Sequence, residues 1–249
     1  MKKLLIILFS FLTSGILMSQ DMKLDELLEK YLKTIGQDKF AKIQTIKITG
    51  KMVYPNGAEF SMTVIKKHPN LDRTEMEFQG TRIIAVFDGQ TGWMINPVSG
   101  SLDPQDMSAD MLNSNEKDNQ KDPFSIWNNP FFDWKENGNK IELVGKEDLN
   151  GTPVYNLKMT FNESDVVNYY MDIAKFVILK MKEKSTIQGQ IAEVETIFSD
   201  FRDVDGIMYP FRYEILYNSQ SAVVITVDKI EFNLPVDDAI FKKPEVNKK

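Results

Sequence analysis

The chain has 249 residues, with 30 basic and 36 acidic side chains, a formal net charge of −6 and no cysteine. This acidic balance excludes the classes of nucleic-acid-binding protein that depend on a basic surface. The lack of cysteine excludes disulfides, so the apolar residues, 42% of the chain, must stabilise the fold by themselves.

The first twenty residues have the pattern of a secretory signal peptide. Two lysines precede an apolar run at residues 4–18, which is short for a membrane span. We expect cleavage near residues 19–20, which leaves one domain, residues 21–249, with a net charge of −8 in the periplasm. Because the chain has no cysteine, the mature protein is not expected to carry a lipid anchor. An uncleaved anchor helix is the alternative.

The next segment predicts an amphipathic helix. Its apolar residues recur at the spacing of one helix face, and they are Leu24, Leu27, Leu28, Tyr31, Leu32 and Ile35. Gly36 follows the last of them, and a glycine just after an apolar stripe is typical of a helix end.

Beyond this helix the apolar period changes from 3.6 to 2, which is typical of strands with one apolar and one wet face. The clearest alternation covers residues 46–54, 60–64, 74–78, 155–161, 167–173, 177–181, 192–198, 211–217 and 223–227. Hairpin signals stand at Asn56-Gly57, Asp88-Gly89, Asn150-Gly151 and Asp205-Gly206. We therefore predict about ten or eleven antiparallel strands joined by hairpins.

Residues 99–139 interrupt this rhythm. The segment is rich in polar residues, yet it keeps large apolar groups that a disordered linker would not carry, including Trp127 and Trp134. A short helix is expected to start near Pro104, and a second helical turn at Asp122 and Pro123. We predict that the segment covers the apolar face of the sheet. Either it packs tightly there, or the sheet curls and leaves space for a ligand.

Three stretches resemble the LolA-like family of outer-membrane lipoprotein carriers, within the periplasmic LolA/LolB-like superfamily. Residues 67–71 read Lys-His-Pro-Asn-Leu, and residues 87–97 read Phe-Asp-Gly-Gln-Thr-Gly-Trp-Met-Ile-Asn-Pro. The third stretch, residues 234–244, has an acidic turn, a phenylalanine and a late proline. The order of helix, strands, insertion and further strands also follows the family over most of the mature chain.

The resemblance implies a mainly β fold: a single curved antiparallel sheet that forms an unclosed half β-barrel, with an N-terminal helix and a short helical lid. It also implies a monomeric periplasmic carrier that binds acylated lipoproteins or lipids and moves them toward the outer membrane. The implied membrane partners are an inner-membrane ABC transporter and an outer-membrane acceptor. No cofactor and no metal are expected.

Strand alternation and the resemblance together nominate residues for a ligand cavity. The sheet candidates are Met52, Met62, Val64, Thr74, Met76, Phe78, Val86, Trp93 and Ile95, and the lid candidates are Met107, Met111, Phe124, Trp127 and Phe132. His68 replaces an arginine that the family links to lid control, and it can hydrogen-bond a lid carbonyl or gain charge near its titration point. Ordinary core packing is the alternative for the cavity candidates, and a solvent-facing residue is the alternative for His68.

Catalysis is not expected. The chain has one histidine, no cysteine and none of the common nucleophile, zinc-protease or phosphate-loop motifs. The alternative to a carrier is a periplasmic adaptor on the same fold, which senses lipids or lipoproteins instead of moving them. A carrier predicts bound acyl chains and a lid that opens, whereas an adaptor predicts a stable protein partner.

Overall fold

The computed structural model describes residues 22–161, 165–187 and 189–245. The expected signal peptide at residues 1–20 lies outside the described residues. Helix α1 spans Leu24–Thr34 and buries Leu27, Leu28 and Tyr31, as the apolar spacing predicted. The 3-10 helix η1 (Gln37–Lys42) follows.

Gly36 joins α1 to η1 at a close approach to the β-sheet. Its φ is +81°, and a Cβ added there would lie 2.3 Å from the carbonyl oxygen of Gly206. Both the left-handed backbone and the close approach therefore require glycine.

We expect Gly36→Ala to lower the free energy of unfolding by about 2–4 kcal/mol, because it adds a steric clash to backbone strain. Gly57→Ala is the matched control, since Gly57 has a φ of +82° and a Cβ there would meet nothing within 4 Å. Urea denaturation of both variants should show a clearly larger loss for Gly36→Ala. Equal losses would show that the contact with Gly206 is unimportant.

The described residues form thirteen strands in one antiparallel sheet, in the order β6-β5-β4-β3-β2-β1-β13-β12-β11-β10-β9-β8-β7. The strands are β1 (Thr45–Val53), β2 (Glu59–Lys67), β3 (Leu71–Phe78), β4 (Thr81–Phe87), β5 (Gly92–Asn96), β6 (Ser101–Asp106), β7 (Lys140–Leu149), β8 (Thr152–Phe161), β9 (Asp165–Asp172), β10 (Ile178–Ile187), β11 (Gln190–Val204), β12 (Ile207–Tyr217) and β13 (Gln220–Phe232). The prediction of one unclosed antiparallel sheet is confirmed. The prediction of ten or eleven strands is wrong, because the edge strands β6 and β7 carry too weak an alternation.

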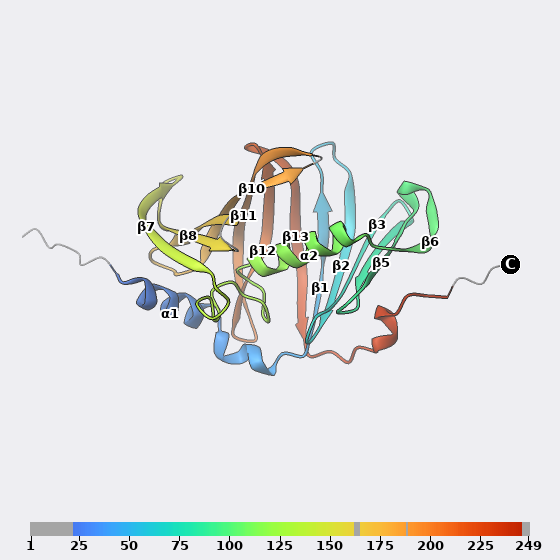
Figure 1. Ribbon diagram of the computed structural model, residues 1–249, viewed down its shortest axis with the longest axis horizontal. Helices are drawn as coiled ribbons and strands as arrows, with labels where there is room; N and C mark the ends of the chain where they lie inside the picture. Colours follow the sequence, from blue (N-terminus) through green and yellow to red (C-terminus); the bar gives the residue numbers. More distant parts are fainter. Residues whose placement is uncertain (1–21, 162–164, 188, 246–249) are drawn as a thin grey trace, which may run out of the picture.

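Two hairpin meanders, β1–β6 and β7–β13, meet where β1 pairs with β13. Their free edges, β6 and β7, are not paired with each other in the described part of the chain, so the barrel stays open. The sheet curves around helix α2 (Ala109–Lys121), which crosses its inner face (Figure 1). We use inner face for the side of the sheet that carries Ile46 and Ile48.

The predicted turn pairs separate into two kinds. Both residues have positive φ at Asn150-Gly151 (52° and 86°) and at Asp205-Gly206 (52° and 81°), as a type I′ turn requires. At Asn56-Gly57 only the glycine has positive φ, and the same holds for Asp88-Gly89. These two pairs lie within longer loops, residues 54–58 and 88–91.

The inner face of the β7–β13 half is filled by a continuous core. Helix α1 and residues 124–134 pack there against the strands. At its centre, the Phe131 ring lies between the rings of Tyr31 and Tyr169, with centroid distances of 5.0 Å on both sides. The hydroxyl of Tyr31 donates to the carbonyl of Pro123. The covering segments thus fill this part of the inner face with interlocked aromatic rings.

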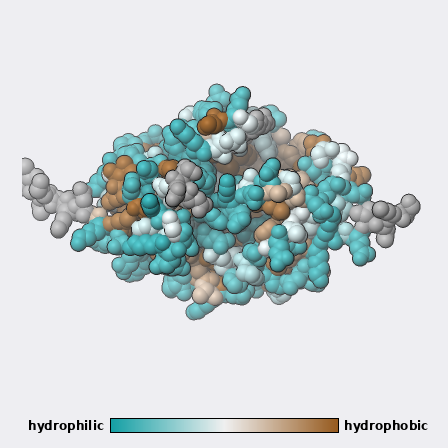
Figure 2. Space-filling view, in the orientation of Figure 1, coloured by the Kyte–Doolittle hydropathy of each residue, from teal (hydrophilic) through white to brown (hydrophobic). Residues whose placement is uncertain are grey.

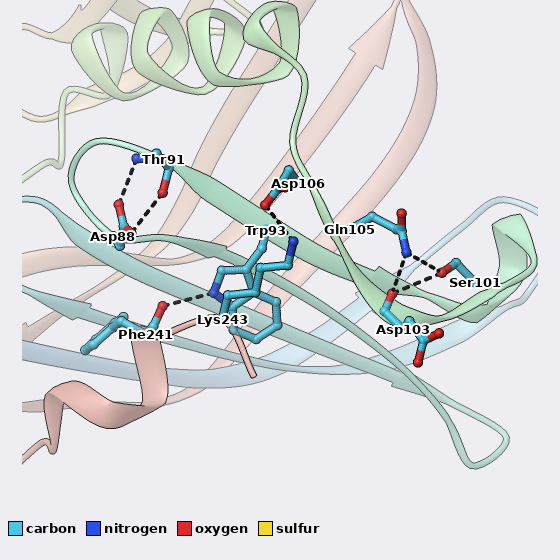
Figure 3. A network of polar contacts seen from close by, with 9 residues as sticks. All are labelled: Asp88, Thr91, Trp93, Ser101, Asp103, Gln105, Asp106, Phe241 and Lys243. Carbon is cyan, nitrogen blue, oxygen red and sulfur yellow. Dashed lines mark hydrogen bonds and ion pairs between the residues drawn. The ribbon is translucent and has the colours of Figure 1, made fainter. Parts of the chain in front are cut away.

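The C-terminal segment covers the outer face of the other half. The 3-10 helix η3 (Asp238–Phe241) buries Phe241 beside Trp93 of β5, whose Nε1 donates to the Phe241 carbonyl at 3.0 Å. Lys243 forms an ion pair with Asp106 at 2.8 Å. Figure 3 shows both contacts, with Trp93 extending from β5 away from α2. A small 3-10 helix, η2 (Pro97–Ser99), connects β5 to β6.

Two helix predictions for the insertion need correction. Pro104 lies in the edge strand β6, where a missing N–H is tolerated, and the helix begins only after Ser108. The Ser108 side chain accepts from the N–H of Met111 at 3.3 Å and caps the helix. Asp122 and Pro123 form a turn closed by the Ser125 N–H donating to the Asp122 carbonyl, not a helix. The covering segment is therefore residues 107–139, shorter than the predicted 99–139.

Candidate ligand-binding site

The inner face encloses a cavity of about 930 Å³ beneath α2, lined by strands β1–β4 and, across the β1–β13 junction, by β12 and β13. This volume is in the upper part of the range for small-molecule pockets. In Figure 1 the helix crosses in front of β12, β13, β1 and β2. Figure 2 shows mostly hydrophilic residues across this face, with apolar atoms set back in a recess above the helix. The space beneath α2 is therefore large enough to hold a ligand.

The floor of the cavity is apolar because alternate residues of neighbouring strands point to the same side. Ile48 of β1 is paired with Val64 of β2, and Met62 lies two residues before Val64 on the same face. Residues of β13 extend this surface across the β1–β13 junction. The apolar floor and wall residues are Ile46, Ile48, Met62, Val64, Leu71, Ala85, Phe87, Ile225 and Val227.

Helix α2 is held at its N-terminal end by apolar contacts with β5. Met107 and Leu112 pack directly on Gly92: a Cβ added to Gly92 would lie 2.6 Å from the Met107 sulfur and 2.9 Å from a Leu112 methyl carbon. The N–H of Met107 donates to the Gly92 carbonyl at 2.8 Å. Glycine at this position lets the helix start close to the sheet.

The C-terminal end of α2 is held by a buried charge. Lys121 is 7% exposed, and its ammonium group lies 2.9 Å from Asp165 and 2.5 Å from Glu183. Burial alone would lower the pKa of Lys121, but the two carboxylates raise it above its ordinary value. Burial also raises the pKa of Glu183, although Lys121 acts in the opposite direction. The hydroxyl of Tyr169 donates to the Lys121 carbonyl at 2.8 Å.

Between these anchors, the side of α2 that faces the cavity is polar. After Ala109 and Leu112, the lining residues at helical spacing are Asn113, Glu116 and Asn119. A helix that only covered a core would carry an apolar stripe at this spacing. The helix therefore roofs the cavity without filling it.

Near the C-terminal end of this roof, Asp122 is half-buried and Asp118 keeps an exposed edge. Burial raises the pKa of Asp122, although Lys66 and the Phe124 N–H act against it. Burial also raises the pKa of Asp118, with Lys121 opposing the shift. Lys66 is already engaged, since its ammonium group lies 3.2 Å from Asp72. These carboxyl groups are thus only partly compensated by the protein.

Seven of the fourteen candidates from the sequence line this cavity. They are Met62, Val64, Thr74, Met107, Phe124, Trp127 and also Val86, which borders the cavity although its side chain packs on the outer face. The structure brings them together from strands β2, β3 and β4 and from both ends of the covering segment. Their role in ligand binding remains a prediction.

Five other candidates lie on the inner face or in the covering segment but outside the cavity. Met52, Met76 and Phe78 share the inner face toward the far end of the strands, where Phe78 stacks on Phe60 at 4.9 Å. Met111 is 42% exposed on α2. Phe132 packs edge-on against Phe40 at 5.8 Å, within the core of the other half.

Trp93 and Ile95 lie on the outer face, contrary to the parity assignment. The β3–β4 hairpin pairs Thr74 with Ala85, so Ala85 shares the inner face and Val86 belongs to the other side. Trp93 pairs with Val86, so its side chain lies on the same outer face. Val86 and Trp93 are buried with Phe241 in a second, smaller cluster. Their large apolar side chains pack against the C-terminal segment instead of a ligand.

His68 is exposed in the turn between β2 and β3, before a cis bond to Pro69. Its ring lies edge-on to that of Trp127, with centroids 5.8 Å apart. The indole N–H of Trp127 donates to the Ile43 carbonyl at 3.1 Å. His68 is therefore placed against the covering segment, and lid control by this residue remains a prediction.

Several lining residues were not nominated from the sequence. They include Ile46, Ile48, Tyr209, Tyr213, Ile225 and Val227. Their alternation marked them as core, but only the pairing of β1 with β13 places them beside Met62 and Val64. Burial raises the pKa of Tyr209 and of Tyr213 above the ordinary value.

Solved structures share this architecture. A DUF1329 family protein from Desulfovibrio piger has a TM-score of 0.57 and 15% identity, covering 87% of this chain and 97% of its own. A LolA superfamily protein from Nitrosomonas europaea has a TM-score of 0.56 and 18% identity, covering 90% and 99%. This chain has the fold of the LolA superfamily. A domain described as outer-membrane lipoprotein-sorting, from Vibrio parahaemolyticus, has a TM-score of 0.53 and 15% identity, covering 87% and 97%.

The LolA-type fold is established here by structure alone. No protein-family model and no curated protein matches the chain by sequence. Within the described part of the chain, none of the helices is both long and apolar enough to cross a bilayer.

Proposed function

We propose that this protein is a periplasmic carrier that holds the acyl chains of lipoproteins or lipids beneath α2 and moves them toward the outer membrane. The observation that carries the proposal is the cavity itself, with an apolar floor and a roof fixed at its two ends. The lipoprotein-sorting description of the Vibrio parahaemolyticus neighbour supports a role in lipoprotein transport.

Exposing an acyl chain to water has a large free-energy cost. Each methylene transferred into water costs about 0.8 kcal/mol, so one palmitoyl chain costs about 12 kcal/mol. A carrier must hide this surface and later release it. The roof can open without unfolding the protein, because Lys121 is the one residue of α2 that is buried.

The proposal extends to the cellular setting. Residues 21–249 form the mature periplasmic domain, which acts as a monomer. Its partners are an inner-membrane ABC transporter that loads it and an outer-membrane acceptor that unloads it. These partners follow from the family resemblance, and His68 beside Trp127 is the proposed contact through which opening is controlled.

The test uses the full chain expressed with its own N-terminus and recovered from the periplasm. Native mass spectrometry is expected to show additional mass from bound acyl molecules, and solvent extraction should release fatty acyl species. A fluorescent fatty acyl probe should bind the delipidated protein. If no acyl molecule co-purifies and the probe does not bind, the proposal is wrong. Binding without transfer to outer-membrane vesicles would instead favour the adaptor.

A further inference from the structure

The polar part of the cavity carries an excess of negative groups. Among the described residues that line it there is one basic side chain, Lys66, and there are four acidic ones, Asp72, Glu116, Asp118 and Asp122. Lys66 is already paired with Asp72. The remaining three carboxyl groups are at or just beyond the α2 roof.

The cavity lining also presents many side-chain amides. It includes seven, namely Asn70, Gln90, Asn113, Asn115, Asn119, Gln120 and Asn128. Side-chain amides both donate and accept hydrogen bonds, whereas ionised carboxylates only accept them. A polar group held beneath α2 would therefore find hydrogen-bond partners of both kinds together with an excess of negative charge, while its alkyl chain lay on the apolar floor.

We propose that the cavity selects amphiphiles whose head group carries no negative charge and offers N–H or O–H donors, with cationic heads bound most tightly. This inference rests on the proposed acyl binding and adds the class of head group. A carboxylate or phosphate head would lie against the carboxyl groups of the roof with only Lys66 to oppose them, and Lys66 would first have to leave Asp72.

The electrostatics of the roof support this assignment. The pKa of Asp118 and that of Asp122 are raised because burial is not fully offset by the nearby lysines. A cation or a hydrogen-bond donor on the ligand would supply the missing compensation. A ligand anion would increase the repulsion instead.

The experiment compares three probes with a twelve-carbon chain in isothermal titration calorimetry at low salt: dodecylammonium, monolauroylglycerol and dodecanoate. We expect the ammonium probe to bind at least about tenfold more tightly than dodecanoate, with the glycerol ester in between. The double variant E116Q/D118N should reduce the ratio between cation and anion at least about threefold.

The matched control is D103N/D110N, which removes the same charge from exposed residues of β6 and α2 outside the cavity lining. It should leave the ratio of cation affinity to anion affinity close to that of the unmodified protein. This result would show that the roof carboxylates, and not the overall negative charge of the protein, select the head group. If dodecanoate binds as tightly as the ammonium probe, or if both double variants change the ratio equally, head-group selection is wrong while acyl binding stands. If none of the three probes binds, the proposed function itself fails.

Discussion

Lys121→Met is expected to lower the free energy of unfolding by about 3 kcal/mol. The substitution keeps the apolar stem but removes the cation that lies between Asp165 and Glu183, and a buried pair that loses one partner leaves an uncompensated charge. Urea denaturation followed by tryptophan fluorescence measures the loss. The same change should release the C-terminal end of α2, so limited proteolysis should cut residues 107–122 faster.

Two further variants make this result specific. Lys117→Met removes a lysine from the exposed side of the same helix and should change stability by less than about 0.5 kcal/mol. Adding Asp165→Asn and Glu183→Gln to Lys121→Met removes the uncompensated carboxylates and should restore part of the loss. If Lys121→Met were as stable as the unmodified protein, the ion pairs would not anchor the helix.

Val64→Asp is expected to weaken acyl-chain binding at least about tenfold, which is about 1.4 kcal/mol. The new carboxylate would lie in the apolar floor among Ile48, Met62 and the alkyl chain, where it would lose hydration when the chain binds. Titration of the delipidated protein with a fluorescent fatty acyl probe measures the change. The fold should persist, because position 64 borders a cavity and not the solid core.

Ser61→Asp is the control for this variant. It places the same charge on the same strand, but position 61 alternates with Met62 and Val64 and lies on the outer, exposed side. It should bind the probe as the unmodified protein does. Equal affinities of Val64→Asp and Ser61→Asp would mean that the chain binds elsewhere.

The spacing of apolar residues predicted those helices and strands whose two faces differ most in hydrophobicity. Helix α1 was correct to within a residue, because its buried side, Leu27, Leu28 and Tyr31, contrasts with charged neighbours. The edge strands β6 and β7 were missed because most of their residues are exposed, so neither face carries a continuous apolar row. Pro104 is compatible with a helix start, but an edge strand tolerates a proline equally well.

The faces of β4 and β5 show why the site was only half predicted. Strand β4 has apolar residues on both sides, with Ile83 and Ala85 on the inner face and Ile84 and Val86 on the outer face. Alternation of apolar and polar residues therefore could not show which side chains point into the barrel. The two-residue turn at Gln79-Gly80, where both φ values are positive, sets the register of the β3–β4 hairpin. That register moves Trp93 and Ile95 to the outer face.

The amino-acid sequence by itself determined the period-2 strands, the first helix and an insertion with too many apolar groups for a linker, because these depend on neighbours within one turn or one strand. Only the tertiary structure decided where the inner face is solid and where it is hollow. That outcome depends on contacts between residues far apart in the chain: Tyr31 and Phe131 fill one part, whereas the polar inner side of α2 roofs the other without filling it.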